Sequence, residues 1–294
     1  MLIIVDSSSG ICCASIVPAK GPHPFAVSFG CRFLDELGYQ KMTMQTYGED
    51  LITSWAKAVW QEWEKLQTGT ADCVVAEKQL AIRTSTKEDH ATTALVGATA
   101  QSIEGLTRTL RFAAERHLGM YIGPQSSLLP CVVRHAAYLL TKFRVRLNGS
   151  PAFEDFRSVD IESPILPLFE AVVTKHPGVL DRKLEEAWIT GIWLGRSTDT
   201  NEHLVSSQYG VIRARTVRRL AHEIQWDKQL AEKVIWLPWA AYDASKTKQT
   251  PAWTPTEICQ AFEEELQPIR RVCRRRNYTP AYRQGLPDEV LAHR

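Results

Sequence analysis

The sequence lacks the paired cysteine and histidine spacings that build structural zinc modules. None of its seven cysteines forms a C-x-x-C pair, and an odd number of scattered cysteines does not suit a disulfide framework either. It also lacks an apolar run long enough for a membrane span or a signal peptide. The net charge of +2 indicates no particular class of partner. We therefore expect an intracellular protein, nuclear or cytoplasmic, with no membrane partner.

Apolar residues recur at strand and helix intervals through the first half of the chain. Continuous or alternating apolar runs predict strands over 2–6, 11–19 and 41–46. Apolar residues at helical spacing predict helices over 24–38, 49–67, 92–119 and 127–145. Trp55, Trp60 and Trp63 of the second helix are expected to pack in the core. The order of elements predicts an α/β domain with one sheet that the N-terminal strands begin.

The pattern changes after residues 148–156. From about residue 165 the apolar segments are short, and turn-forming stretches such as TDTNE and QYG separate them. Short strands with such turns are typical of a small barrel or a β-meander. After about residue 226 the pattern loosens, so we expect a loosely ordered basic tail over 226–294, apart from a helix at 256–269.

Arginine is dense near the end of the β-like region. The run RARTVRR contains Arg213, Arg215, Arg218 and Arg219. In one continuous strand the first two point to one face, and Arg219 shares that face. A row of guanidinium groups suits the phosphates of DNA or RNA at short range. A solvated strand face is the other interpretation of this run.

The apolar helix at 127–145 carries two further basic residues, Arg134 and His135. On one interpretation they face nucleic acid. On the other they satisfy neighbouring backbone or acidic groups, as polar residues on an apolar helix commonly do. The sequence leaves both open.

Asp6 ends the first apolar run and is followed at once by Ser-Ser-Ser-Gly. A carboxylate at a strand end is a good place for a metal ion, because hard divalent cations prefer oxygen ligands. Asp and Ser also end strands and start turns without any metal. The residues around Asp6 do not decide between these interpretations.

Several stretches together resemble the integrase region of copia-type retrotransposon polyproteins. VDSSSGICCASIVPAKGPHPFAV is similar to the opening strand pair of that family, and FLDELGYQKMTMQTYGEDLITSWAKAV to the segment with its second catalytic Asp. QSIEGLTRTLRFAAERHLG is similar to the long helix after the catalytic Glu. The most specific match is GIWLGRSTDTNEHLVSSQYGVIRARTVRRL, which resembles the small β unit. The resemblance covers roughly residues 1–225 and leaves the tail outside.

The resemblance implies a fold and a chemistry. It implies a ribonuclease-H-like α/β integrase core over 1–122, a helical connector over 123–158 and a small β-barrel-like domain over 159–225. The family joins DNA strands with two Mg²⁺ or Mn²⁺ ions, which three carboxylates hold. Asp6 corresponds to the first of these carboxylates, and so to a metal ligand and a remnant of the catalytic set.

The other two catalytic positions depart from the family pattern. Tyr47 stands where the family has its second Asp, and Glu49 follows at a helix N-terminus, where acidic residues are common anyway. The third position falls on or near Gly97, and Glu104 lies about two turns further on, roughly 10 Å along the axis. Glu49 and Glu104 are therefore weak substitutes. LFEAVV also replaces an FGE-like sequence, which loses a glycine.

We therefore expect an integrase-like protein whose ancestral role is metal-dependent DNA integration. With one of three carboxylates left, we expect it to be catalytically inactive, without productively bound Mg²⁺ or Mn²⁺, and still able to bind DNA or RNA. The alternative is a non-catalytic interaction protein that keeps the fold for assembly. In that case the helices at 49–67 and 92–119 would be the pairing faces of a homo-oligomer.

Overall fold

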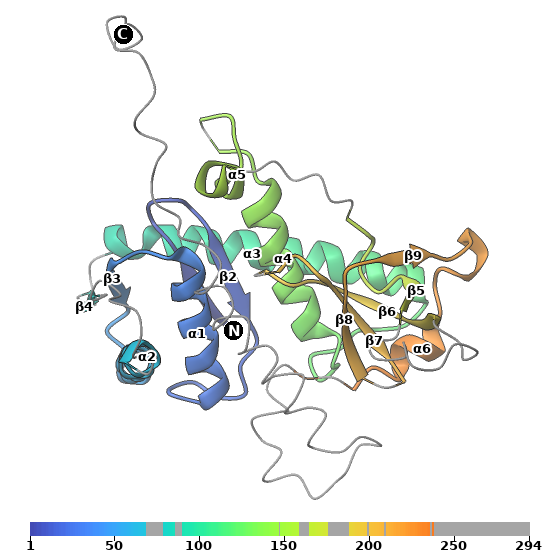
Figure 1. Ribbon diagram of the computed structural model, residues 1–294, viewed down its shortest axis with the longest axis horizontal. Coiled ribbons are helices and arrows are strands. Elements are labelled where there is room, and N and C mark those ends of the chain that lie inside the picture. Colours follow the sequence, from blue (N-terminus) through green and yellow to red (C-terminus); the bar gives the residue numbers. More distant parts are fainter. Residues whose placement is uncertain are drawn as a thin grey trace, which may run out of the picture. The chain divides into compact units, whose positions relative to one another are not determined.

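The computed structural model of the chain is a mixed α/β structure (Figure 1). It describes residues 1–68, 79–85, 90–146, 148–158, 165–175, 188–198, 200–208, 210–235 and 237. All of these residues lie within one unit, Met1–Tyr242. No helix in these ranges is long and apolar enough to cross a membrane.

Strands and helices alternate at the start of the chain, and further helices follow. The strands are β1 (Leu2–Val5), β2 (Cys12–Ser15), β3 (Lys41–Thr46) and β4 (Gln79–Thr84). The helices are α1 (Pro24–Leu37), α2 (Asp50–Thr68), α3 (His90–Leu118), α4 (Leu129–Phe143) and α5 (Ala152–Arg157). The strands and helices predicted for this part of the chain are confirmed, with small shifts at their ends.

The antiparallel hairpin of β1 and β2 lies between two groups of helices. Leu2 and Ile4 of β1 pack with residues of α1 and α2. Ile3 and Val5, which point to the opposite face, pack with residues of α3 and α4. Figure 1 shows the hairpin between α1 and α4. Cover on both faces explains why β1 is a continuous apolar run instead of an alternating one.

The parallel strands β3 and β4 form a separate pair. No backbone ladder joins them to β1 in the part of the chain that the structure describes, so the prediction of one sheet begun by the N-terminal strands is wrong there. Side chains connect the two pairs instead, because Met42 and Met44 pack in the same cluster as Leu2 and Ile4. The other face of β3 and β4 is largely polar and exposed.

Helices α1 and α2 pack through two tryptophans. The Nε1–H group of Trp55 donates to the carbonyl oxygen of Ala26 at 3.0 Å, and that of Trp63 donates to Oδ1 of Asp35 at 2.7 Å. Trp60 is 39% exposed, so its predicted place in the core is wrong. A spacing of four residues through Val59 keeps Trp55 and Trp63 on one stripe, and Trp60 lies off that stripe.

A five-stranded antiparallel sheet follows, in the order β8-β7-β6-β5-β9. Its strands are β5 (Ala171–Lys175), β6 (Trp188–Arg196), β7 (His203–Ser207), β8 (Gly210–Ala214) and β9 (Val217–Arg219). The first four form the predicted meander, and β9 returns to pair with β5. The described strands do not close into the predicted barrel, because the edge strands β8 and β9 are not paired with each other.

The two edge strands of this sheet, β8 and β9, follow each other directly in the chain. Only Arg215 and Thr216 separate β8 from β9. The Cα atoms of Ala214 and Val217 can therefore lie at most about 11 Å apart, whereas the edges of a flat five-stranded sheet lie about 19 Å apart. The sheet must curl until its edges approach. At the β9 end of the link, Oγ1 of Thr174 on β5 donates to the carbonyl oxygen of Thr216 at 3.3 Å.

Residues after the sheet belong to its core, which corrects the expected start of the tail at 226. A 3-10 turn (His222–Ile224) and helix α6 (Lys228–Glu232) follow β9. Ala231 and Val234 are buried in the same cluster as β5 and β6, and the ring of Trp226 stacks on His117 of α3 with centroids 4.2 Å apart. The expected helix at 256–269 and the rest of the tail lie outside the described residues.

A matched pair of glycines tests the helix packing. A Cβ atom on Gly30 of α1 would lie 2.9 Å from Cζ2 of Trp55 and 2.9 Å from Cγ2 of Val59, whereas one on Gly105 of α3 would meet open space. We predict that Gly30→Val lowers the free energy of unfolding by about 2 kcal/mol, because it overpacks the core. Gly105→Ala should raise it by about 0.5–1 kcal/mol through helix propensity.

Urea denaturation followed by circular dichroism measures both free energies of unfolding. A Gly30→Val variant as stable as the unmodified chain would contradict the described contact between α1 and α2, and a less stable Gly105→Ala variant would contradict the open space beside Gly105.

Candidate nucleic-acid interface

Asp6 forms the turn that ends β1. Its backbone N–H donates to the carbonyl oxygen of Ile11 at 2.8 Å, and its carbonyl oxygen accepts from the N–H of Gly10 at 2.8 Å. Its carboxylate accepts hydrogen bonds from the backbone N–H and the hydroxyl of both Ser8 and Ser9. The hydroxyl of Tyr39 adds a fifth donor at 2.9 Å. These are the contacts of a strand-ending turn.

Tyr39 reaches Asp6 because α1 ends two residues earlier. Gly38 caps α1 in the left-handed conformation, with φ of 68°, and its N–H donates to the carbonyl oxygen of Leu34. Partial burial raises the pKa of Asp6, but the hydrogen bonds from Ser9, Ser8 and Tyr39 outweigh it, so the pKa lies below its ordinary value of 3.8. The turn therefore stabilises the ionised carboxylate.

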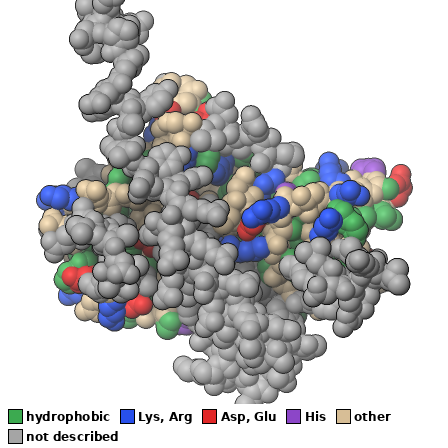
Figure 2. Space-filling view, in the orientation of Figure 1, with side chains coloured by type: hydrophobic (Ala, Val, Ile, Leu, Met, Phe, Trp, Pro, Cys, Tyr) green, Lys and Arg blue, Asp and Glu red, His purple; other side chains and the backbone are tan. Residues whose placement is uncertain are grey.

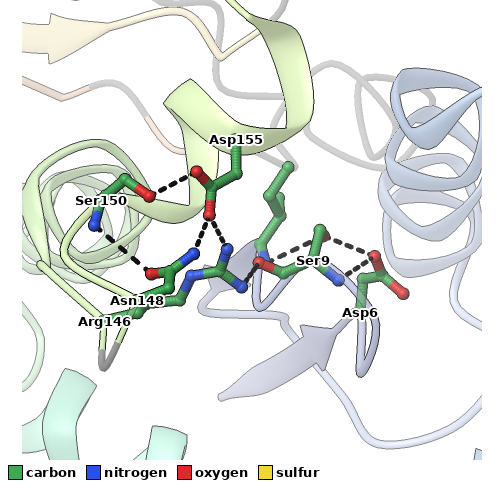
Figure 3. A network of polar contacts seen from close by, with 7 residues as sticks. Asp6, Ser9, Arg146, Asn148, Ser150 and Asp155 are labelled. Carbon is green, nitrogen blue, oxygen red and sulfur yellow. Dashed lines mark hydrogen bonds and ion pairs between the residues drawn. The ribbon is translucent and has the colours of Figure 1, made fainter. Parts of the chain in front are cut away.

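A polar network continues from this turn to the segment after α4 (Figure 3). Nη1 of Arg146 donates to the carbonyl oxygen of Ser9 at 2.6 Å, and its Nη2 pairs with the carboxylate of Asp155 on α5. Asn148 and Ser150 also donate to Asp155. A guanidinium group is thus the cation beside the Asp6 turn, and it ties the turn to α5.

The residues around Asp6 do not fit a paired magnesium site. Its carboxylate oxygens are engaged by hydroxyl and N–H donors, and Glu49 forms an ion pair with Lys20 at 3.0 Å. Glu104 is exposed on α3, and Tyr47, where the resemblance implies the second carboxylate, is 43% exposed. In the described ranges no group of three or more His, Cys, Asp or Glu side chains could hold a metal ion.

The arginine run does not form one strand, so the predicted single row is corrected. Arg213 is in β8 and Arg218 and Arg219 are in β9, at the opposite edge of the sheet. Arg215 lies in the link between them. The chain crosses from one edge to the other at this link, which breaks the alternation that the continuous strand assumed. Figure 2 shows Lys and Arg side chains in the right half of the view, where Figure 1 places this sheet.

Arg219 is half-exposed and pairs with a buried carboxylate. Its Nε and Nη2 groups donate to the two carboxylate oxygens of Glu170 at 2.7 and 2.9 Å. Glu170 is fully buried, and its hydrogen bond with Arg219 raises the pKa of the guanidinium. Arg219 therefore fixes β9 to the core, because a bidentate pair holds both groups in one orientation.

The residue before Glu170 is Phe169, which is also fully buried. Its φ is 69°, a value that non-glycine residues rarely adopt.

Arg213 and Arg215 share one carboxylate. Glu202, just before β7, lies 4.0 Å from Nη1 of Arg213 and 3.6 Å from Nε of Arg215. Thr200 also donates to it at 3.0 Å. The side chain of Arg215 is 91% exposed, so it lies at the surface even while it is paired. A phosphate group could reach both arginines only in competition with Glu202.

Arg218 contacts an aromatic ring. Its Cζ atom lies 4.3 Å from the ring centroid of Trp188 on β6, and Nζ of Lys175 on β5 lies 5.8 Å from the same centroid. Trp188, Lys175 and Glu202 were not predicted from the sequence as partners of the arginines. The segments that contain them read as strands, but the cross-strand register that pairs them is not visible in a single sequence.

His135 is a core residue. It is buried, and its ring lies 5.9 Å from that of Tyr138 and 5.3 Å from that of Trp193. Nε1 of Trp193 in turn donates to Nδ1 of His203 at 3.0 Å. Burial lowers the pKa of both histidines to about 4, so both are neutral at pH 7. His135 is thus packed among aromatic rings, and its Nδ1 atom has no hydrogen-bond partner in the described structure, so the predicted backbone or acidic partner is not found at that atom. A nucleic-acid contact of the half-buried Arg134 stays a prediction.

Comparisons with known proteins give little further guidance. No protein-family model matches the chain, and no curated protein matches it. A solved structure that is similar to it is a chain of the simian T-cell lymphotropic virus intasome in complex with PP2A regulatory subunit B56 gamma. The identity is 15% and the TM-score 0.35, over 74% of this chain and 71% of that chain. A likeness of this size carries no argument about fold or function.

The Asp6 turn predicts a pH dependence of stability. Because the folded state lowers the pKa of Asp6, its contribution is present above the unfolded pKa of about 4 and is lost as the pH falls through the folded pKa. Asp6→Asn should cost about 1 kcal/mol at pH 6 and less at pH 3. Urea midpoints at pH 6, 4 and 3 measure this difference.

Glu64→Gln is the matched control, because Glu64 is exposed on α2. It should change stability little at any of these pH values. An equal cost of Asp6→Asn at pH 6 and pH 3 would contradict the described hydrogen bonds to the ionised carboxylate.

Proposed function

We propose that the chain is an integrase-like protein of retroelement origin that binds nucleic acid and does not join DNA strands. The sequence resemblance described above supports the origin. The observation that carries the binding is the pair of arginines at the edge of β8, Arg213 and Arg215, of which Arg215 is 91% exposed. Guanidinium groups on one small β unit suit a phosphate backbone.

The proposed loss of chemistry follows from the residues at the catalytic positions. Two-metal strand transfer needs carboxylates that bridge both ions. The resemblance aligns Tyr47 and Gly97 with two of the three positions, and neither side chain supplies a carboxylate. The third, Asp6, is engaged by Ser8, Ser9 and Tyr39. A single carboxylate does not hold two divalent ions against their hydration.

A strand-transfer assay tests this part of the proposal. With a matched DNA end and either Mg²⁺ or Mn²⁺, we expect no joined product above the background without protein. Asp6→Asn should leave that result unchanged. An active integrase on its own DNA end serves as the positive control, and metal-dependent joining that Asp6→Asn abolishes would refute the proposal.

The proposed binding rests on the arginines at the edge of β8. Each phosphate that a basic side chain neutralises releases counterions, so affinity falls steeply as salt rises. Glu202 holds Arg213 and Arg215 at 4.0 and 3.6 Å. This carboxylate therefore competes with phosphate for both, and it weakens binding without preventing it.

Fluorescence anisotropy with a labelled DNA duplex at several salt concentrations tests the binding. We expect the double substitution Arg213→Gln, Arg215→Gln to weaken binding and to reduce the slope of log affinity against log salt by about 1–2 units. Glu202→Gln should strengthen binding, because it removes the carboxylate that pairs with both guanidinium groups. Lys57→Gln, on the exposed face of α2, is the control and should change neither the affinity nor the slope.

A second function remains a candidate because two helices carry exposed aromatic rings. Phe112 of α3 is 58% exposed and Trp60 of α2 is 39% exposed. On this alternative the chain is a non-catalytic assembly protein that pairs with a second copy through these helices. The same titrations decide: steep salt-dependent binding supports the first function, whereas no binding together with a stable dimer in sedimentation supports the second.

A further inference from the structure

Three side chains from three strands meet on one face of the five-stranded sheet. Lys175 of β5 lies opposite Trp188 of β6 in the antiparallel register, and Arg218 of β9 lies opposite Val173 of β5. Val173 and Lys175 are two residues apart, so they share a face, and their partners share it too. Because β9 and β6 flank β5, the side chain of Arg218 crosses β5 to reach the ring of Trp188, 4.3 Å from its centroid.

Lys175 and Arg218 differ from the three ion-paired arginines nearby in sequence or in the sheet. Arg213 and Arg215 are paired with Glu202, and Arg219 with Glu170. Lys175 and Arg218 are exposed, and within the described part of the chain neither forms an ion pair. Their common neighbour is an indole ring that is itself partly exposed.

An indole ring flanked by two cations has a defined ligand chemistry. Aromatic rings and guanidinium planes stack on nucleic-acid bases, and the cations attract the adjoining phosphates. In a duplex the bases are already stacked on one another, so an indole ring adds little stacking energy. Unpaired bases are free to stack on it.

We propose that Trp188, Lys175 and Arg218 form a stacking site for single-stranded nucleic acid. This inference rests on the proposed function and specifies it: the edge of β8 contacts phosphates of any strand, and the Trp188 site adds affinity for unpaired bases alone. Trp188 supplies the stacking surface, Arg218 supports the ring, and Lys175 attracts a phosphate beside the stacked base.

The test compares a labelled 20-nucleotide single strand with the matching 20-base-pair duplex in anisotropy titrations. Trp188→Leu should weaken single-strand binding by at least about fivefold, which corresponds to the weakest stacking of one base, and should change duplex binding by less than about twofold. Trp188→Phe keeps a ring and should retain most of the affinity. Trp60→Leu removes an exposed tryptophan from α2 and should affect neither ligand.

Arg218→Gln keeps Trp188 and serves as a second variant if the leucine variant does not fold. It should weaken single-strand binding and reduce its salt slope by about one unit. A polyglutamate peptide of similar length is titrated as a competitor, because two cations could also attract an acidic protein segment.

The outcomes separate this inference from the proposed function. A loss confined to the single strand supports the inference. If Trp188→Leu and Arg218→Gln weaken both ligands equally or neither, or if polyglutamate binds as tightly as the single strand, the stacking site is overturned while duplex binding stands. If the unmodified chain binds neither nucleic acid, the proposed function itself fails.

Discussion

The two-residue link between β8 and β9 is the constraint on which the second half of the structure depends. Because it joins the two edge strands, the sheet has to curl, and the curled sheet can enclose apolar side chains such as Val172 and Val205. The same link sends Arg213 and Arg218 to opposite edges. Core packing and the distribution of surface charge therefore have one geometric cause.

Periodicity predicted the elements of the first half but not how they join. The buried runs and the helical stripes are local patterns, so β1, α1 and α2 could be read directly. Whether β1 pairs with β3 depends on contacts between distant residues, which no local pattern records. The division into core, connector and β domain stays a prediction for the same reason. Asp227 is a typical N-cap residue, and its carboxylate accepts from the N–H of Leu230 at the start of α6. The helix was not predicted, because the residues around Asp227 are polar and show no apolar periodicity.

The candidate site could be predicted only in part. The turn chemistry of Asp6 was one of two interpretations of the sequence, and the serines that follow it are its donors. The contribution of Tyr39 depends on where α1 ends, and that of Trp188 on strand register. Charge density in RARTVRR indicated a basic region, but the carboxylates that pair with it come from distant segments. The sequence shows where basic residues are dense, but the fold determines which of them pair with a carboxylate.

The backbone at Phe169 has a consequence for how such a sequence can change. The resemblance aligns this residue with a glycine, and its φ of 69° is the conformation that glycine adopts without cost. A left-handed backbone costs about 1 kcal/mol for other residues, whereas a fully buried phenylalanine contributes about 3–5 kcal/mol relative to alanine. At this corner the buried ring of Phe169 offsets the cost of its left-handed backbone. A glycine in its place would relax the backbone and leave a cavity the size of a benzyl group.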